Sequence, residues 1–256
     1  MLPKAKKSFG QNFLTDKTVV KKILAAAEIV PGERVLEIGP GTGVLTEALV
    51  DAGASVVAVE SDKDLIPALE EKFGDRIELI EGDILKLHHS VTPSLPSYKL
   101  VANIPYNITS DVIQTFLTAA HKPSRMVLMV QREVADRIVA KPPRMSLLSV
   151  VCQLYADVKK VTNVPAGAFR PVPKVGSAVI QMDQKSETGD NERVIRLAKA
   201  GFSSKRKQLH NNLVSQGFST SDEGKEQLKK LGLDPLARAE TLTVENWVNL
   251  AKVFHY

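Results

Sequence analysis

A glycine-rich loop near the start of the chain is the first feature that could bind a ligand. Gly39, Gly41 and Gly43 alternate after an apolar run at residues 35–38, and a helical pattern follows over residues 44–50. Glycines in such a turn let the backbone approach a nucleotide, with helix N-terminal amides facing it. Their spacing differs from the GxGxxG of dinucleotide sites, which argues against NAD. The loop predicts a nucleoside-containing ligand, with a purely structural turn as the alternative.

Two acidic residues follow the next two apolar runs. Glu60 ends the run that starts at residue 55, and Asp83 comes soon after the run at residues 77–80. A carboxylate at Glu60 can accept hydrogen bonds from both ribose hydroxyls, and Asp83 can accept one from an adenine amino group. Either alone could be a surface carboxylate. Because ligands of open α/β sheets bind at the carboxyl ends of the strands, the two together support a nucleoside site.

The sequence Asn103-Ile104-Pro105-Tyr106 follows another apolar run. The amino group of adenine is a poor nucleophile, because its lone pair is delocalised into the ring. The Asn103 side-chain oxygen and the Ile104 carbonyl can both accept from that amino group while Tyr106 stacks on the base, so no strong general base is required. In isolation the four residues would be a strand-terminating turn with a buried tyrosine. Beside the glycine loop, Glu60 and Asp83, they favour alkylation of an adenine amino group.

The elements that position these residues alternate between strand and helix. Such alternation is typical of βαβ units and a mostly parallel sheet. The predicted strands are residues 35–38, 55–59, 77–80, 100–102, 126–130 and 178–182.

The pattern changes after the last of these strands. A polar stretch without apolar residues reaches Asn191, and apolar residues at helical spacing follow it. We therefore predict a ligand-binding domain over residues 1–185 with a basic arm at 1–10, a linker at 186–191, and a small all-helical domain at 192–256.

Composition and charge narrow the class of protein. The 256 residues, 43% of them hydrophobic, predict a packed core, and the single cysteine, Cys152, fits a reducing compartment. Without a signal-peptide or membrane-span pattern, we expect a soluble cytoplasmic protein, and a monomer. Residues 1–30 hold six basic against two acidic side chains, and residues 191–256 hold eleven against seven. Two basic flanks suggest a polyanionic partner, although lysine-rich solvated helices would give the same counts.

Further motifs extend the pattern along nearly the whole chain. With the residues above, they resemble the KsgA (RsmA) ribosomal RNA adenine dimethyltransferases. The added motifs are Gln11-Asn12-Phe13-Leu14, Glu37-Ile38-Gly39-Pro40-Gly41-Thr42-Gly43, Gly82-Asp83, Phe169-Arg170-Pro171-Val172-Pro173-Lys174-Val175, Lys205-Arg206-Lys207-Gln208-Leu209, Asn211-Asn212-Leu213 and Arg238-Ala239-Glu240.

The resemblance implies a class I (Rossmann-like) methyltransferase with a mostly parallel seven-stranded sheet and S-adenosylmethionine as cofactor. It implies that two adjacent adenosines near the 3′ end of 16S ribosomal RNA, in the small subunit, become N6,N6-dimethyladenosine. Catalysis would use Asn103, Ile104, Pro105 and Tyr106, with Tyr106 and a loop residue, Phe169, stacking on the base. The cofactor would contact Gln11, Asn12, Leu14, Gly39, Gly41, Gly43, Glu60, Asp83, Ile84 and Asn103.

RNA contacts are expected from basic residues at both ends, since lysine and arginine neutralise phosphates. They are Lys4, Lys6, Lys7, Lys205, Arg206 and Lys207, with Arg132 and Arg137 as weaker candidates. The five histidines show no metal-ligand spacing, so we predict no metal. The sequence departs from the family pattern at Gly176, where Asp is common, and at residues 141–144, where a Tyr-Gly pair is frequent.

The sequence leaves three other functions open. An RNA-binding assembly factor on the same fold would occupy the immature small subunit without catalysis as its main role. A resistance methylase acting on large-subunit RNA shares most of the motifs. An NAD dehydrogenase is the most distant alternative. The intact Asn103–Tyr106 motif and the C-terminal pattern around Arg238 favour the small-subunit enzyme.

Overall fold

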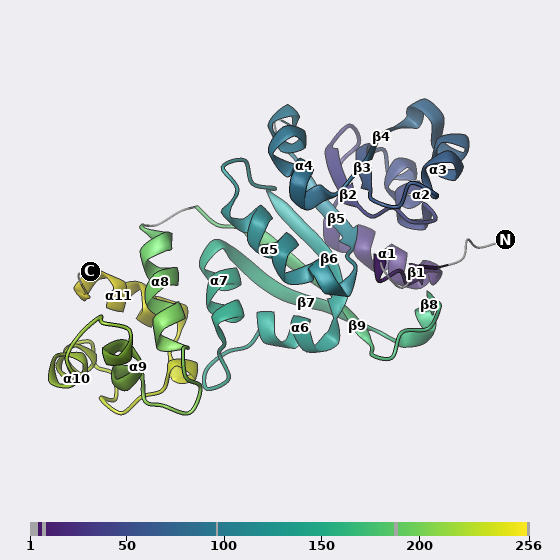
Figure 1. Ribbon diagram of the computed structural model, residues 1–256. Coiled ribbons are helices and arrows are strands. Elements are labelled where there is room, and N and C mark those ends of the chain that lie inside the picture. The colour runs from purple at the N-terminus through teal and green to yellow at the C-terminus, as the bar shows by residue number, and fades with distance from the viewer. Residues whose placement is uncertain (1–4, 7–8, 96, 187–188, 255–256) are drawn as a thin grey trace. The chain divides into compact units, whose positions relative to one another are not determined.

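The computed structural model describes residues 5–6, 9–95, 97–186 and 189–254, and the chain divides into two compact units (Figure 1). The first comprises Met1–Ala135 and Asp157–Gln184, and the second Asp136–Ala156 and Lys185–Tyr256. No helix within the described ranges is long and apolar enough to cross a membrane.

A seven-stranded sheet forms the centre of the first unit, as predicted. Its order is β4 (Ile77–Glu81), β3 (Ser55–Glu60), β2 (Arg34–Ile38), β5 (Lys99–Asn103), β6 (Arg125–Gln131), β9 (Ser177–Gln184) and β7 (Ala156–Val164). The strands from β4 to β6 are parallel, and β9 runs antiparallel to β6. Each of the six predicted strands lies inside an observed one. The edge strand β7 was missed because only its first and last residues are buried and polar residues interrupt it, so it forms no apolar run.

The order of the strands reverses around β2. The chain passes from β2 outward to β3 and β4, and then returns to β5 on the other side of β2. In open α/β sheets the connections diverge at such a point and leave a crevice at the carboxyl ends of the strands. Four of the predicted site segments follow the carboxyl ends of β2, β3, β4 and β5.

The helices of the first unit bury an apolar stripe against the sheet. They are α1 (Lys17–Ala27), α2 (Val44–Asp51), α3 (Ile66–Phe73), α4 (Ile84–Val91) and α5 (Thr109–Thr118). Asp16 begins α1, because its side chain accepts from the amides of Thr18 and Val19. Val20 and Ile23 of α1 then join a core cluster with Leu49 of α2.

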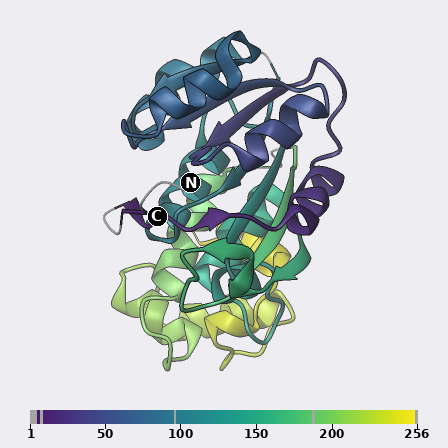
Figure 2. The ribbon, with the colours of Figure 1, turned by 90° about the vertical axis from the view of Figure 1, so that its right-hand side faces the viewer.

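A second, two-stranded sheet joins distant parts of the first unit. β1 (Phe13–Leu14) lies beside β8 (Phe169–Arg170) (Figure 1; Figure 2 shows the ribbon turned by 90°), and the two strands pair antiparallel, with Leu14 opposite Phe169. This pairing fixes the segment before α1, which lies next to the glycine loop: a Cβ on Gly41 would be 3.2 Å from the Phe13 ring.

The second unit is built from helices around Trp247, which is fully buried. Its helices are α7 (Leu147–Tyr155), α8 (Asn191–Gly201), α9 (Leu209–Ser215), α10 (Ser221–Lys230) and α11 (Val244–Val253), while α6 (Arg132–Ile138) spans the boundary. Short 3-10 helices complete the chain: η2 (Gly74–Arg76), η3 (Thr92–Ser94), η4 (Tyr106–Ile108), η5 (Ala166–Ala168) and η6 (Ala239–Thr241).

The observed units differ from the predicted domain boundaries at two points. The helical unit is larger than residues 192–256, because residues 136–156 belong to it: Met145, Val150 and Leu154 lie in the core cluster around Trp247. The other boundary falls after Gln184, one residue before the predicted one. Of the expected linker at 186–191, residues 187 and 188 lie outside the described residues.

Candidate functional site

The glycine loop adopts a backbone that side chains would not tolerate. Gly39, Gly41 and Gly43 have φ values of 66°, 59° and 73°, in the left-handed region. A Cβ on Gly43 would also lie 2.5 Å from the Phe73 ring. Gly39 and Gly41 line a pocket at the carboxyl ends of the strands, whereas Gly43 does not. We predicted that Gly43 contacts the cofactor. In the structure Gly43 instead precedes α2 and lies close to Phe73, and it does not line the pocket.

Glu60 lies at the end of β3 with both carboxylate oxygens engaged. Its Oε2 accepts from the amide of Gly41 at 3.0 Å, and its Oε1 accepts from the amide of Asp62 at 2.9 Å. Burial raises the pKa of Glu60, although these backbone hydrogen bonds oppose the shift. A carboxylate has about four acceptor sites, so Glu60 can hold the glycine loop and still accept a hydrogen bond from a ligand hydroxyl.

Asp83 and Ile84 lie at the start of α4 and also line the pocket. One oxygen of Asp83 caps the helix by accepting from the amide of Leu85 at 3.0 Å. The carboxylate is exposed at the pocket, and Ile84 is buried below it. The pair can offer an acceptor and an apolar wall to a flat ring.

Glu37 is a buried acidic residue of the pocket that the sequence did not lead us to assign to the site. It lies in β2 with 1% exposure and lines the pocket, and its Oε2 has no hydrogen-bond partner among the described residues. Burial raises the pKa of Glu37 to about 8. A carboxyl group inside an otherwise apolar strand was the available signal, because such a group needs a partner. A cation entering the pocket would supply one.

The Asn103–Tyr106 segment borders the same pocket. The Asn103 Nδ2 donates to the carbonyl of Asn12 at 3.1 Å, and no described residue donates to its Oδ1. The amide of Ile104 donates to the Met129 carbonyl at 3.3 Å. The segment thus presents one amide oxygen, held in orientation from its nitrogen side.

Tyr106 is half-buried at the start of η4, just after Pro105. Its hydroxyl forms a 2.7 Å hydrogen bond with the Ser177 hydroxyl. Burial raises the pKa of Tyr106, and the bond to Ser177 lowers it by less. The Tyr106 ring is held at its hydroxyl by Ser177 and at its other end by the backbone of η4, so its face is a fixed surface on which a base can stack.

The pocket brings most of the predicted site together. Among the predicted cofactor and catalytic residues it contains Gln11, Asn12, Leu14, Gly39, Gly41, Glu60, Asp83, Ile84, Asn103, Ile104, Pro105 and Tyr106. Residues quoted only as motif letters, or not considered, also line it: Phe9, Phe13, Glu37, Thr42, Ser61 and Leu65.

The placement of Phe169 in a loop is wrong. Phe169 lies in β8 opposite Leu14, and its side chain is fully buried in the core cluster that contains Leu14. It presents no face to a base and does not line the pocket. The pairing between segments some 150 residues apart is what removed it from the surface.

The predicted RNA-contacting residues fall into three groups. Lys205, Arg206 and Lys207 are exposed in the turn between α8 and α9, which Asn212 holds by donating to the carbonyls of Gly201 and Ser204. Lys6 is instead engaged by acidic side chains within the first unit. Lys4 and Lys7 lie outside the described residues.

The weaker candidates and the departures from the family pattern lie on different segments. Arg132 and Arg137 are exposed on α6, and the Arg132 amide donates to the Gly176 carbonyl at 3.0 Å. Residues 141–144 form part of the second unit. None of these residues lines the pocket. Within the described ranges, no three metal-ligating side chains gather in one place.

Comparison with known proteins decides the family. The family model described as Ribosomal RNA adenine dimethylase matches residues 2–255. The chain belongs to this family. It is 42% identical over 254 residues to the Ribosomal RNA small subunit methyltransferase A of Syntrophotalea carbinolica, covering 97% of this chain and 96% of that protein. It is 46% identical over 255 residues to the same-named protein of Dehalococcoides mccartyi, covering 96% and 87%.

Solved structures agree with the fold. A dimethyladenosine transferase from Plasmodium falciparum superposes with a TM-score of 0.80 at 28% identity, over 93% of this chain and 95% of that one. The 23S rRNA methyltransferase ErmE superposes with a TM-score of 0.78 at 27% identity, over 95% and 99%. The predicted class I methyltransferase fold is therefore confirmed.

Proposed function

We propose that this protein uses S-adenosylmethionine to dimethylate the N6 amino groups of two adjacent adenosines near the 3′ end of 16S ribosomal RNA, as part of small-subunit biogenesis in the cytoplasm. The observation that carries the proposal is the open Asn103 oxygen beside Tyr106 in one pocket with Glu60 and Asp83. The names of the curated relatives support the small subunit as substrate.

The pocket fits the proposed cofactor. Gly39 and Gly41 provide a backbone surface without side chains, and Glu60 and Asp83 provide acceptors for ribose and adenine. The unpartnered oxygen of Glu37 provides a site for a cation. S-Adenosylmethionine supplies a methyl group already activated by its sulfonium, so the chain's contribution is mainly placement.

The residues at the end of β5 would position the target. The Asn103 Oδ1 accepts from the N6 amino group, and the Ile104 carbonyl is the second proposed acceptor. These two bonds direct the amine lone pair out of the ring plane, and Tyr106 holds the base by stacking. Lys205, Arg206 and Lys207 would bind RNA phosphates from the second unit, which positions the RNA without reading its sequence.

The test is transfer of labelled methyl groups to isolated ribosomal subunits that lack the modification. We expect N6,N6-dimethyladenosine in the RNA of small subunits and no label in large subunits. Label only in large subunits would instead make the protein a large-subunit methylase like ErmE. Tight binding to small subunits without label would make it an assembly factor.

A further inference from the structure

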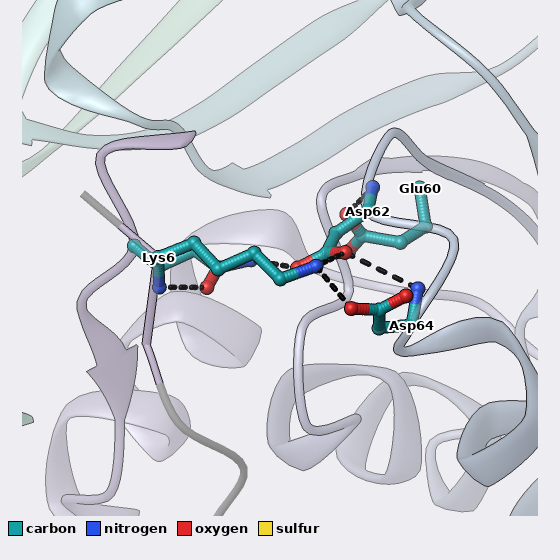
Figure 3. Close-up of polar contacts among 5 residues, drawn as sticks. Lys6, Glu60, Asp62 and Asp64 are labelled. Atoms are coloured by element: carbon teal, nitrogen blue, oxygen red, sulfur yellow. Dashed lines mark hydrogen bonds and ion pairs between the residues drawn. The ribbon is translucent and has the colours of Figure 1, made fainter. Parts of the chain in front are cut away.

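The Lys6 ammonium is bound by acidic side chains, whereas a lysine that binds phosphate would hold its ammonium free. Its ammonium lies between two carboxylates, 2.5 Å from Asp62 Oδ1 and 2.5 Å from Asp64 Oδ2 (Figure 3). Its backbone amide donates to Gln11 Oε1 at 2.7 Å, and Gln11 Nε2 donates to the other oxygen of Asp62 at 2.7 Å. We call these four residues the clasp.

The clasp is centred on a buried charge. The Asp62 side chain is 2% exposed, whereas those of Lys6 and Asp64 are 34% and 63% exposed. Burial raises the pKa of Asp62, but the hydrogen bonds from Lys6, Gln11 and the Asp64 amide outweigh it and leave the pKa lowered. A buried carboxylate is costly unless it is paired, so Asp62 holds Lys6 more specifically than an exposed residue would.

The clasp joins two walls of the cofactor pocket. On one side, residues 9–14 follow Lys6 along the chain and line the pocket. On the other side, Asp62 donates its amide to Glu60, whose second oxygen holds Gly41. Phe13 further packs with Leu65 and Leu69, which lie just after the clasp. Opening the clasp would therefore loosen one wall from the other.

Residues 9–14, which we call the arm, also reach the catalytic end of the pocket. The carbonyl of Asn12 accepts from Asn103 Nδ2 at 3.1 Å, and this bond orients the Asn103 oxygen. Gly10 packs closely on the segment that follows Asn103: a Cβ added to Gly10 would lie 2.9 Å from Asn107 Oδ1. The arm thus runs from the loop after β3 to the loop after β5.

We propose that Lys6 is a positioning residue for methyl transfer. Its clasp on Asp62 and Asp64 holds the arm closed along the adenosine-containing cofactor and keeps Asn12 in place to orient Asn103. This inference rests on the proposed function. It assigns Lys6 to the cofactor site and not to RNA phosphates.

The test compares Lys6→Met with Lys63→Met in the full-length protein. Lys63 is an exposed lysine between the two clasp aspartates, so the control removes the same charge from the same loop. We expect Lys6→Met to raise the Kd for S-adenosylhomocysteine, measured by calorimetry, roughly tenfold, because it removes charge-assisted hydrogen bonds. It should also lower kcat and speed amide exchange in residues 9–14, with KM for small subunits unchanged. Lys63→Met should change none of these.

A second pair of variants separates the clasp from general destabilisation. Asp64→Asn keeps the buried Asp62 partner and should weaken S-adenosylhomocysteine binding by a few fold, even if Lys6→Met folds poorly. Added to Lys6→Met, it should have no further effect, because the contact is already lost. Equal effects of Asp64→Asn in both backgrounds would overturn the proposal.

Two other outcomes distinguish a failure of the proposed function from a failure of the proposed role of Lys6. If wild-type protein binds no S-adenosylhomocysteine and transfers no methyl group, the proposed function itself is wrong. If the wild type does both and Lys6→Met raises only the KM for subunits and weakens its salt dependence, Lys6 contacts RNA and the clasp proposal fails.

Discussion

The two ends of the parallel strands differ in whether their charged and polar side chains have hydrogen-bond partners. At the amino end, Arg125 opens β6 and bonds to Glu28 at 2.8 Å and Asp183 at 2.5 Å. Beside it, Lys99 opens β5 and bonds to Glu33 at 2.9 Å and to the Glu28 carbonyl at 2.8 Å. These charged side chains are therefore paired with one another within the first unit.

At the carboxyl end, two polar oxygens lack a hydrogen-bond donor among the described residues. The Oε2 of Glu37 has no partner among the described residues, and none of those residues donates to the Asn103 oxygen. Leaving the buried Glu37 oxygen without a partner costs stability, which a bound ligand can return, whereas the Asn103 oxygen stays available to a substrate. The comparison suggests that the amino end serves the fold and the carboxyl end serves the reaction.

The largest effect is expected where an incomplete group faces the reaction. Asn103→Ala should lower kcat by roughly a hundredfold to a thousandfold, the usual range for losing one positioned hydrogen-bonding group in a transition state. Thermal stability should change little, because only one internal hydrogen bond, to Asn12, is lost. Single-turnover methyl transfer and thermal unfolding measure the two effects. A variant that keeps near-normal kcat would remove Asn103 from catalysis.

The opposite behaviour is expected at the amino end. Arg125→Met should lower the free energy of unfolding by about 2 kcal/mol, because Asp183 Oδ1 and the Ala26 carbonyl lose their donor, while Asp183 Oδ2 keeps its bond from Gln181. The kcat of the folded enzyme should stay the same. Urea unfolding followed by an activity assay in buffer measures both.

Arg34 provides the matched control for Arg125. It also opens a strand at the amino end, but its pair with Glu78 is 3.8 Å long and exposed, so Arg34→Met should have almost no effect on stability. If the two arginine variants lost equal stability, the completed ion pairs of Arg125 would not be what stabilises this end.

The smallest expected effect is the release of a fraction of a proton from Glu37 when a ligand binds. With a pKa of about 8, Glu37 is mostly protonated in the free protein at neutral pH. The ammonium of S-adenosylhomocysteine should lower that pKa, so binding should release a proton and affinity should rise from pH 6 toward 8. Glu37→Gln should remove both the rise and the release. Calorimetry in buffers of different ionisation enthalpy measures the proton, and the same release from both proteins would contradict this role.

The residues at the strand ends were predictable because local patterns were enough. Apolar runs located the strands, and the carboxyl ends of parallel strands must meet, so Glu60, Asp83 and Asn103 were expected at one edge. The alternating glycines likewise announced the turn before α2. The location of these residues at the strand ends follows from the strand pattern alone, although the contacts that orient their side chains, such as that of Asn103 with Asn12, do not.

Contacts between distant segments were not predictable in the same way. Lys6 and Asp62 are 56 residues apart, and neither residue type indicates its partner. Phe169 looked like a surface aromatic until β8 paired with β1. Residues 136–156 carry an ordinary helical pattern, which fits either unit until their packing near Trp247 is seen.

The short pairing of β1 with β8 has a consequence for the protein's own synthesis. A nascent chain that has reached Tyr106 already contains the glycine loop, Glu60, Asp83 and Asn103. It still lacks Phe169 and Arg170, against which Phe13 and Leu14 align. The arm beside the pocket therefore receives its partner strand late in translation, and the site reaches its final form only after about two thirds of the chain has left the ribosome.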